Sequence, residues 1–265
     1  MRIPSLPRSS APLFAAAQAN LIIDVGMSEG NDTAFYLAKG FDVVGVEADP
    51  TMHEALRRRF AAEISARRLH LLHRAAAGTS GETVRFWHDN HDQGHSRLHV
   101  DGNPAGDPTG DGRMSEFAVM TVGWDELRAL AGVPHYMKID IEGAEPAFLR
   151  SLAGTPMLPS FISAEVQTFQ PIQALHDVGY RHFRLINQTM FHGIRLPEPP
   201  LEGTYAPPPD PQHWSGPFGR ELMGRRWFGF EEIRAIHDSI HRLWEHGTLI
   251  NGWMDCHACV PDMVA

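Results

Sequence analysis

Two short apolar runs near the start of the chain constrain its fold more than any other feature. The first, LIIDV at 21–25, breaks at Gly26 into a loop that leads to a helical segment from about Asn31. The second, FDVVGVE at 41–47, follows that segment. An apolar run bounded by glycine, then a helix, then a second apolar run is typical of a βαβ unit. Gly26 and Gly30 suit the loop because a residue without Cβ can turn sharply and approach a bound molecule.

The ends of these two runs predict an adenosine-cofactor site. Glu47 ends the second run about twenty residues after Gly26, where nucleotide-binding sheets place a carboxylate that accepts both ribose hydroxyls. The simpler alternative is an ordinary strand–glycine–helix turn that binds no ligand.

The spacing of the loop disfavours a dinucleotide. A pyrophosphate binder has the pattern G-x-G-x-x-G, whereas Ser28 stands between Gly26 and Gly30 here. Glu29 and Asp32 stand at the mouth of the helix, where their carboxylates would repel a phosphate. A phosphate-free adenosine derivative with a positive centre fits better, which favours S-adenosylmethionine. The missing third glycine also disfavours a nucleotide-dependent oxidoreductase.

The aspartate of the first run is predicted to pair with the ammonium of this cofactor. Small residues after a third expected strand, RAAAG at 74–78, leave room for a flat base at the carboxyl end of that strand. We therefore predict cofactor contacts from the ends of the first three strands and from one later aspartate: Asp24, Gly26, Met27, Ser28, Gly30, Asp32, Glu47, Ala48, Ala75, Ala76 and Asp140.

Strands alternating with helices predict a doubly wound, mostly parallel α/β sheet. Further strands are expected at 69–73, 83–87, 117–122, 136–141, 161–166 and 181–186, and helices at 32–38, 51–66, 124–130, 144–152, 171–178 and 230–246. We expect a tail with a short helix over 1–20, a main cofactor-binding domain over 21–190, and an extension of the same domain over 191–265.

The extension is unlike the rest of the chain. A proline-rich run over 196–219 cannot form the interior of a sheet, yet it contains Tyr205, Trp214 and Phe218. So many aromatic residues favour an ordered segment, and we predict a cap that covers the acceptor. Cys256 and Cys259 resemble half of a zinc site without a second pair, so a packing role at the chain end is expected.

The composition excludes several classes of protein. With 265 residues, 43% hydrophobic and 21% charged, the chain is typical of one soluble globular domain. Its net charge of −9 argues against a nucleic-acid partner. We find no apolar run of about 18 residues and expect no membrane span, and the proline-interrupted N-terminus does not resemble a signal peptide. We expect a cytoplasmic enzyme that acts on a small molecule, with a homodimer left open.

The most informative later stretch is MKIDIEGAE at 137–145. Alternation along a strand would put Lys138, Asp140 and Glu142 on one side. Three charged side chains in a buried strand are unfavourable unless they pair or bind a ligand. One interpretation is a structural ion cluster in which Lys138 neutralises a carboxylate. The other places Asp140 and Glu142 at the carboxyl edge of the sheet, where open α/β sheets bind ligands.

Five segments of the chain together resemble the FkbM family of S-adenosylmethionine-dependent methyltransferases: DVG at 24–26, EADP at 47–50, RAAAG at 74–78, MTVGWDEL at 120–127 and KIDIEGAE at 138–145. The last is the family's most distinctive signature. The resemblance implies a class I methyltransferase (Rossmann-like) fold and methyl transfer to a hydroxyl of a sugar, polyketide or other secondary metabolite. Transfer to an amine and a non-catalytic cofactor-binding module stay open as alternatives.

An alcohol that accepts a methyl group loses its proton, so a base near the acceptor helps the reaction. We predict Asp140 as the base or orienting group, with Glu142 second, although either can instead bind the cofactor's ammonium. Lys138 and His95 complete the predicted catalytic residues. His95 belongs to a histidine-rich loop whose spacing matches no metal motif, so no metal site is predicted.

Three residues are predicted to contact the acceptor. Ser96 falls where the resemblance to the family places a serine after a strand, and Arg97 follows it. Trp214 belongs to the aromatic cap.

Overall fold

The structure is a computed structural model that describes residues 20–89, 97–98, 114–191, 193–210, 214–222, 226–247 and 252–263. The elements of its first half are β1 (Leu21–Val25), α1 (Asn31–Ala38), β2 (Asp42–Glu47), α2 (Pro50–Arg59), α3 (Ala61–Ser65), β3 (Leu69–His73), β4 (Ala75–Ala76), β5 (Thr83–Asp89), β6 (Arg97–Leu98), β7 (Met114–Val122) and α4 (Trp124–Ala131). Those of its second half are β8 (Tyr136–Ile139), α5 (Glu145–Arg150), β9 (Phe161–Glu165), α6 (Gln170–Val178), β10 (His182–Asn187), α7 (Phe230–Glu245) and β11 (Met254–Cys259).

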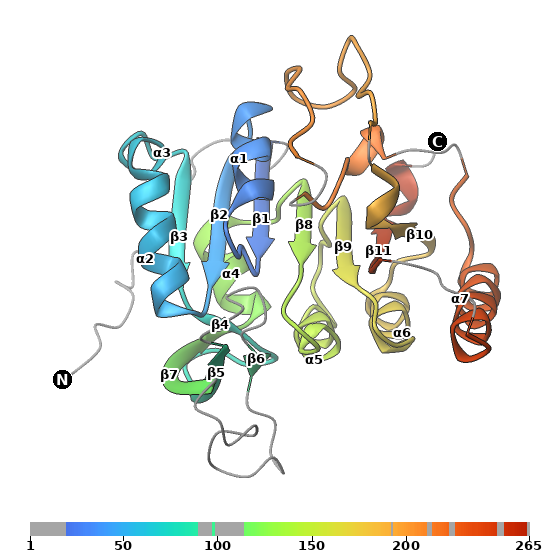
Figure 1. Cartoon of the computed structure of the whole chain (residues 1–265), viewed down its shortest axis with the longest axis horizontal. Helices are drawn as coiled ribbons and strands as arrows, with labels where there is room; N and C mark the ends of the chain where they lie inside the picture. The colour runs from blue at the N-terminus through green and yellow to red at the C-terminus, as the bar shows by residue number, and fades with distance from the viewer. Residues whose placement is uncertain are drawn as a thin grey trace.

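Seven strands form one sheet in the order β10-β11-β9-β8-β1-β2-β3 (Figure 1). The strands from β3 to β9 in this order pair in parallel. Only β11 runs against its neighbours β9 and β10 among the described strands of this sheet. The predicted doubly wound, mostly parallel fold is confirmed.

The two faces of the sheet are covered by different parts of the chain. One face packs against α4, α5, α6 and α7, with Trp124 and Phe148 among the buried contacts. The other face packs against α1, which contains Phe35, and against α2. Trp214 and Phe218 of the C-terminal extension pack on the same face. Burial on both faces explains why the strands are apolar runs without alternation.

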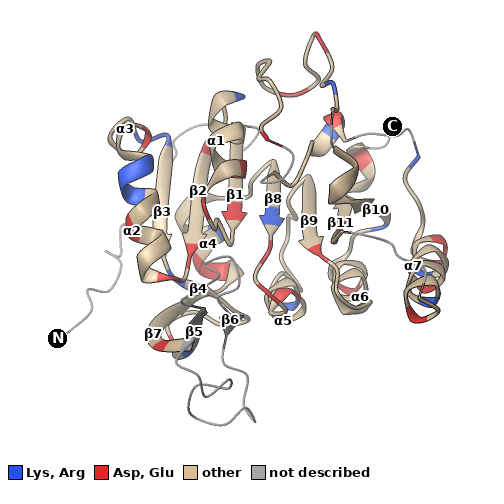
Figure 2. Cartoon of the chain, viewed as in Figure 1, with Lys and Arg blue, Asp and Glu red and all other residues tan. Residues whose placement is uncertain are grey.

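A second sheet, in the order β4-β7-β5-β6, lies at the carboxyl edge of the main sheet (Figure 1). Figure 2 shows acidic residues at the same edge, at the ends of β1, β2 and β9 and in the loop after β8. Figure 2 also shows a basic stretch on β8, and Lys138 of this strand pairs with Asp32 and Asp140. Ligands of open parallel sheets bind at this edge, so the acidic residues are placed where a site is expected.

The C-terminal extension differs from its prediction in two respects. Cys256 and Cys259 do pack in the core, as expected, but they do so within an unexpected strand, β11, which is inserted between β9 and β10. The aromatic residues Trp214 and Phe218 are buried against α1 rather than over a ligand, because they pack on Phe35. The described part of the extension therefore completes the sheet with β11 and contributes to the cover of both faces, with Trp214 and Phe218 on one and α7 on the other.

Smaller differences concern the ends of elements. The helix expected over 51–66 breaks at Phe60 into α2 and α3, and the strand expected over 136–141 ends at Ile139. The short helix expected within 1–20 lies outside the described residues. No helix in the described ranges has the length and apolar character that a membrane crossing requires.

Candidate functional site

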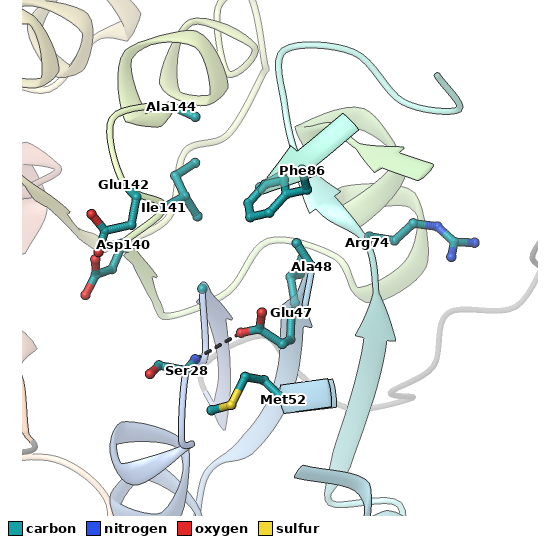
Figure 3. Close-up of a pocket in the computed structure, with 13 residues that line it drawn as sticks. Ser28, Glu47, Ala48, Met52, Arg74, Phe86, Asp140, Ile141, Glu142 and Ala144 are labelled. Carbon is teal, nitrogen blue, oxygen red and sulfur yellow. Dashed lines mark hydrogen bonds between the residues drawn. The ribbon is translucent and has the colours of Figure 1, made fainter. Parts of the chain in front are cut away.

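A pocket opens at the carboxyl edge, between the ends of β1, β2 and β8 and the second sheet (Figure 3). It is lined by Gly26, Ser28, Val46, Glu47, Ala48, Met52, Arg74, Ala76, Phe86, Asp140, Ile141, Glu142 and Ala144. Figure 3 shows the side chain of Phe86 over the middle of the pocket, while that of Arg74 points away from it. The lining thus has an apolar part and a carboxylate-rich part.

The loop after β1 passes very close to the loop after β8. Gly26 has φ +85°, and a Cβ built there would lie 1.8 Å from the carbonyl oxygen of Asp140. The backbone N–H of Gly26 donates to the carbonyl of Val46 at 2.9 Å, and that of Asp140 donates to Val25 at 2.9 Å. Glycine is required here because any side chain would push apart the two strand ends that form the pocket floor.

Glu47 is held by the backbone on both of its carboxylate oxygens. Ser28 N–H donates to Oε2 at 3.0 Å, and Asp49 N–H donates to Oε1 at 2.8 Å. Burial raises the pKa of Glu47 to about 7, against the lowering effect of these donors. Each oxygen keeps a second lone pair, so the carboxylate can still accept two hydroxyl groups from the pocket.

Asp24, near the end of β1, is fully buried. Thr33 Oγ1 donates to its Oδ2 at 2.6 Å, and its Oδ1 has no hydrogen-bond partner among the described residues. Burial raises the pKa of Asp24 to about 7, although the nearby Lys138 ammonium lowers it. A buried carboxylate oxygen without a partner is unfavourable, which is the usual sign of a position that a ligand or water completes.

Lys138 is a buried cation between two carboxylates. Its Nζ lies 3.2 Å from Oδ2 of Asp32 and 3.2 Å from Oδ2 of Asp140. Burial alone would lower the pKa of Lys138, but Asp140, Asp32 and Asp24 outweigh it and hold the pKa well above its usual range. The ammonium therefore stays charged and holds Oδ2 of Asp140 in an ion pair.

The loop after β8 is not an extension of the strand. Glu142 has φ +55° and Gly143 φ +96°, so strand alternation does not set the direction of Glu142. The carboxylate of Glu145 closes this loop by accepting from Ile141 N–H at 2.9 Å and Gly143 N–H at 3.2 Å. The turn still brings both Asp140 and Glu142 to the pocket (Figure 3).

The predicted site residues fall into three groups. Those that line the pocket are Gly26, Ser28, Glu47, Ala48, Ala76, Asp140 and Glu142. Those that are buried around it without lining it are Asp24, Met27, Gly30, Asp32, Ala75 and Lys138. Met27, for example, turns its sulfur toward Gly45 in the core.

Other predicted residues are not part of the described lining. Trp214 is 3% exposed and packs edge-on against Phe35 at 5.0 Å, so it lies in the core rather than at the acceptor. His95 and Ser96 lie outside the described residues, and only the backbone of Arg97 is described, in β6. Among the described residues, no group of three or more metal-ligating side chains comes together.

Six lining residues were missed: Val46, Met52, Arg74, Phe86, Ile141 and Ala144. Val46, Arg74 and Ile141 directly follow or precede a predicted residue, so a wider window around each strand end would have included them. Phe86 is different, because it belongs to the second sheet, where it lies opposite Phe117 of β7, 31 residues later in the chain. No local pattern indicates that pairing across more than thirty residues.

A protein-family model matches the chain by sequence. The family model described as the methyltransferase FkbM domain matches residues 24–195. Among curated proteins, none matches the chain.

Several solved structures resemble the chain at low identity. A methyltransferase FkbM from Methylobacillus flagellatus KT is 16% identical, with a TM-score of 0.41 over 66% of this chain and 42% of its own. A precorrin-6y C5,15-methyltransferase from Geobacter metallireducens GS-15 is 12% identical, with a TM-score of 0.37 over 66% and 70% of the two chains. A StiE O-MT segment is 9% identical, with a TM-score of 0.42 over 93% and 71%. The chain spans less than half the length of the first of these proteins.

Proposed function

Because this chain belongs to the methyltransferase FkbM domain family, we propose that it transfers a methyl group from S-adenosylmethionine to a hydroxyl of a small molecule such as a sugar or another secondary metabolite. The observation that carries the proposal is the Glu47 carboxylate, both of whose oxygens are oriented by backbone donors at the pocket. A carboxylate fixed in this way suits the two neighbouring hydroxyls of a ribose.

The residues around the pocket fit this cofactor in three respects. Ala48 and Ala76 leave space for a flat base beside Glu47. Gly26 leaves the pocket floor free of a side chain. The buried Oδ1 of Asp24 has no partner among the described residues and can accept from an ammonium. When bound, the cofactor supplies an electrophilic methyl group on a sulfonium.

The residues of the chain supply positioning and a base. Asp140 and Glu142 line the pocket beside the apolar side chains of Phe86 and Ile141. Asp140 would accept the proton of the acceptor hydroxyl as the hydroxyl oxygen attacks the methyl carbon. Lys138 would hold the Asp140 carboxylate in place. Most of the rate enhancement is expected from holding the acceptor oxygen in line with the methyl group at near-attack distance.

Transfer to an amine is the second candidate. The two carboxylates that line the pocket, Asp140 and Glu142, would attract a protonated amine and could take its proton before attack. A hydroxyl acceptor needs only one of them. The choice between the two acceptors follows from experiment.

Two measurements test the proposal in sequence. Calorimetry with S-adenosylmethionine and with NAD should give binding of the first and none of the second. A screen with labelled methyl groups, using matched alcohol and amine acceptors, should then give transfer to the alcohols. No affinity for S-adenosylmethionine would refute the cofactor assignment, and transfer to amines alone would replace the hydroxyl by the second candidate.

A further inference from the structure

A chain of four side chains connects the C-terminal extension to the pocket. Ser215 donates to both oxygens of the Asp32 carboxylate, from its backbone N–H to Oδ1 at 2.9 Å and from Oγ to Oδ2 at 2.7 Å. The same Oδ2 lies 3.2 Å from Nζ of Lys138. The ammonium in turn lies 3.2 Å from Oδ2 of Asp140, which lines the pocket. Ser215 is therefore three contacts away from the proposed base.

The middle of this chain is a shared cation. Lys138 and Asp32 are both buried, so their charges are poorly screened and must remain paired. One ammonium serves two carboxylates. If Asp32 loses the hydroxyl that donates to its Oδ2, that oxygen attracts the ammonium more strongly, and the contact with Asp140 weakens.

Aromatic contacts on both sides of Ser215 hold it in place. On its N-terminal side, Trp214 packs edge-on against Phe35 with ring centres 5.0 Å apart. On its C-terminal side, Phe218 stacks on Tyr136 at 4.8 Å, and Tyr136 is on the same strand as Lys138. The serine therefore sits between two aromatic anchors, one on α1 and one on β8.

We propose that Ser215 is a positioning residue for methyl transfer, acting on Asp140 through Asp32 and Lys138. The proposal rests on the proposed function, because it assumes that Asp140 acts on the acceptor. Ser215 lies outside the matched residues 24–195, so the extension of this particular chain supplies the contact.

Other ionisable groups also face this cluster, and removing a neutral hydroxyl changes none of them directly. They come from several neighbouring elements: Asp24 on β1, Tyr36 on α1, Tyr136 on β8, Glu145 on α5, Glu165 on β9 and Asp255 on β11. Any change at Lys138 after substitution of Ser215 therefore reports the contact with Asp32.

The sequence offers an unusually direct readout, because Lys39 and Lys138 are its only lysines. Both are buried, but Lys39 pairs with Glu221 at 2.8 Å rather than with Asp32 or Asp140. In protein labelled with ¹⁵N-lysine, Ser215→Ala should move the ammonium resonance of Lys138 and leave that of Lys39 in place. Ser215→Thr keeps the hydroxyl and should restore the wild-type resonance.

Turnover gives the functional readout, with the acceptor identified by the labelled-methyl screen. Ser215→Ala should lower kcat by roughly threefold to tenfold, the size expected for one indirect hydrogen bond to a charged group. Affinity for S-adenosylmethionine should stay the same. Thr204→Val is the matched control, since Thr204 Oγ1 ties the same extension to Ala38 at the far end of α1; it should leave kcat and the Lys138 resonance unchanged.

A double-mutant cycle separates this inference from the function on which it rests. If Ser215 acts through Asp140, Ser215→Ala should have no further effect on kcat in an Asp140→Asn background. Additive losses, or an unmoved Lys138 resonance, would overturn the role of Ser215 alone. Wild-type turnover of Asp140→Asn would instead overturn the proposed role of Asp140.

Discussion

The two sides of the pocket are held together by different kinds of contact. At the ends of β1 and β2, Glu47 accepts from two backbone N–H groups, and Gly26 crosses close to the backbone of the opposite loop. After β8, Asp140 is held by Lys138, which also pairs with Asp32. The first side depends on backbone geometry, and the second depends on side-chain charges.

This difference has a consequence for how each side responds to change. A backbone contact is lost only when the path of the chain changes. Substitutions on the cofactor side should therefore either leave the binding of S-adenosylmethionine intact or abolish it. The Lys138 ammonium is shared between two carboxylates, so a change in a neighbouring hydrogen bond can strengthen one ion pair and weaken the other. Substitutions on the side with Asp140 should therefore change turnover by graded amounts. Substitutions on the two sides should therefore differ in both size and kind.

Gly26→Ala should have the largest effect. Its Cβ would meet the carbonyl oxygen of Asp140 at 1.8 Å, and backbone cannot yield as a flexible side chain can. We expect the free energy of unfolding to fall by about 3 to 5 kcal/mol, with loss of S-adenosylmethionine binding. Urea unfolding and calorimetry measure the two effects.

Gly143→Ala is the matched control for this crossing. Gly143 also has a positive φ, +96°, but a Cβ there would meet nothing within 4 Å. Only backbone strain remains, which corresponds to a loss of about 1 kcal/mol. Equal losses in the two variants would show that strain, and not the close crossing, limits position 26.

The sequence made the cofactor side predictable and left much of the other side hidden. Gly26 and Glu47 lie within one βαβ unit, so spacing alone located them. Lys138 and Asp140 stand in a recognisable string, but the contact of Lys138 with Asp32 joins segments a hundred residues apart. Ser215 carries no local signal, because its role depends on how the extension packs.

The same reasoning explains the missed strand. β11 contains Asp255 and His257, polar residues that argue against a central strand when the sequence is read alone. In the fold both are buried between β9 and β10, where tertiary pairing overrides the local pattern.

Glu47→Gln should have the next largest effect, on affinity without a comparable loss of stability. The amide presents an N–H₂ group where a carboxylate oxygen now faces the N–H of Ser28 or Asp49, so one acceptor becomes a clash of donors. We expect S-adenosylmethionine to bind about a hundredfold more weakly. Calorimetry beside Glu54→Gln, an exposed surface substitution, provides the reference.

The pH dependence of binding should be smaller and bell-shaped. Burial raises the pKa of Asp24 to about 7, so below that pH the carboxyl is neutral in the free protein and cannot pair with an ammonium. Affinity should rise up to about tenfold per pH unit until Asp24 ionises, then fall again as the cofactor's amino group loses its proton near pH 8. The pKa of Glu47, also raised by burial to about 7, acts in the same direction.

Calorimetry between about pH 6 and pH 9 measures this profile. Asp24→Asn should flatten its acidic limb and leave only the weaker contribution of Glu47. An acidic limb of unchanged steepness in that variant would exclude Asp24 as the partner of the ammonium.

Trp214→Phe should have the smallest effect, and it distinguishes a core residue from an acceptor contact. The indole N–H of Trp214 is buried without a partner among the described residues, so removing it leaves no broken hydrogen bond. Phenylalanine keeps a ring against Phe35, and we expect a change in unfolding free energy below about 1.5 kcal/mol with no change in the KM of the acceptor. Trp214→Ala removes the anchor beside Ser215 and should lower kcat as Ser215→Ala does. A raised KM of the acceptor in the phenylalanine variant would instead show that Trp214 contacts the acceptor, and it would weaken the contrast between the two sides of the pocket.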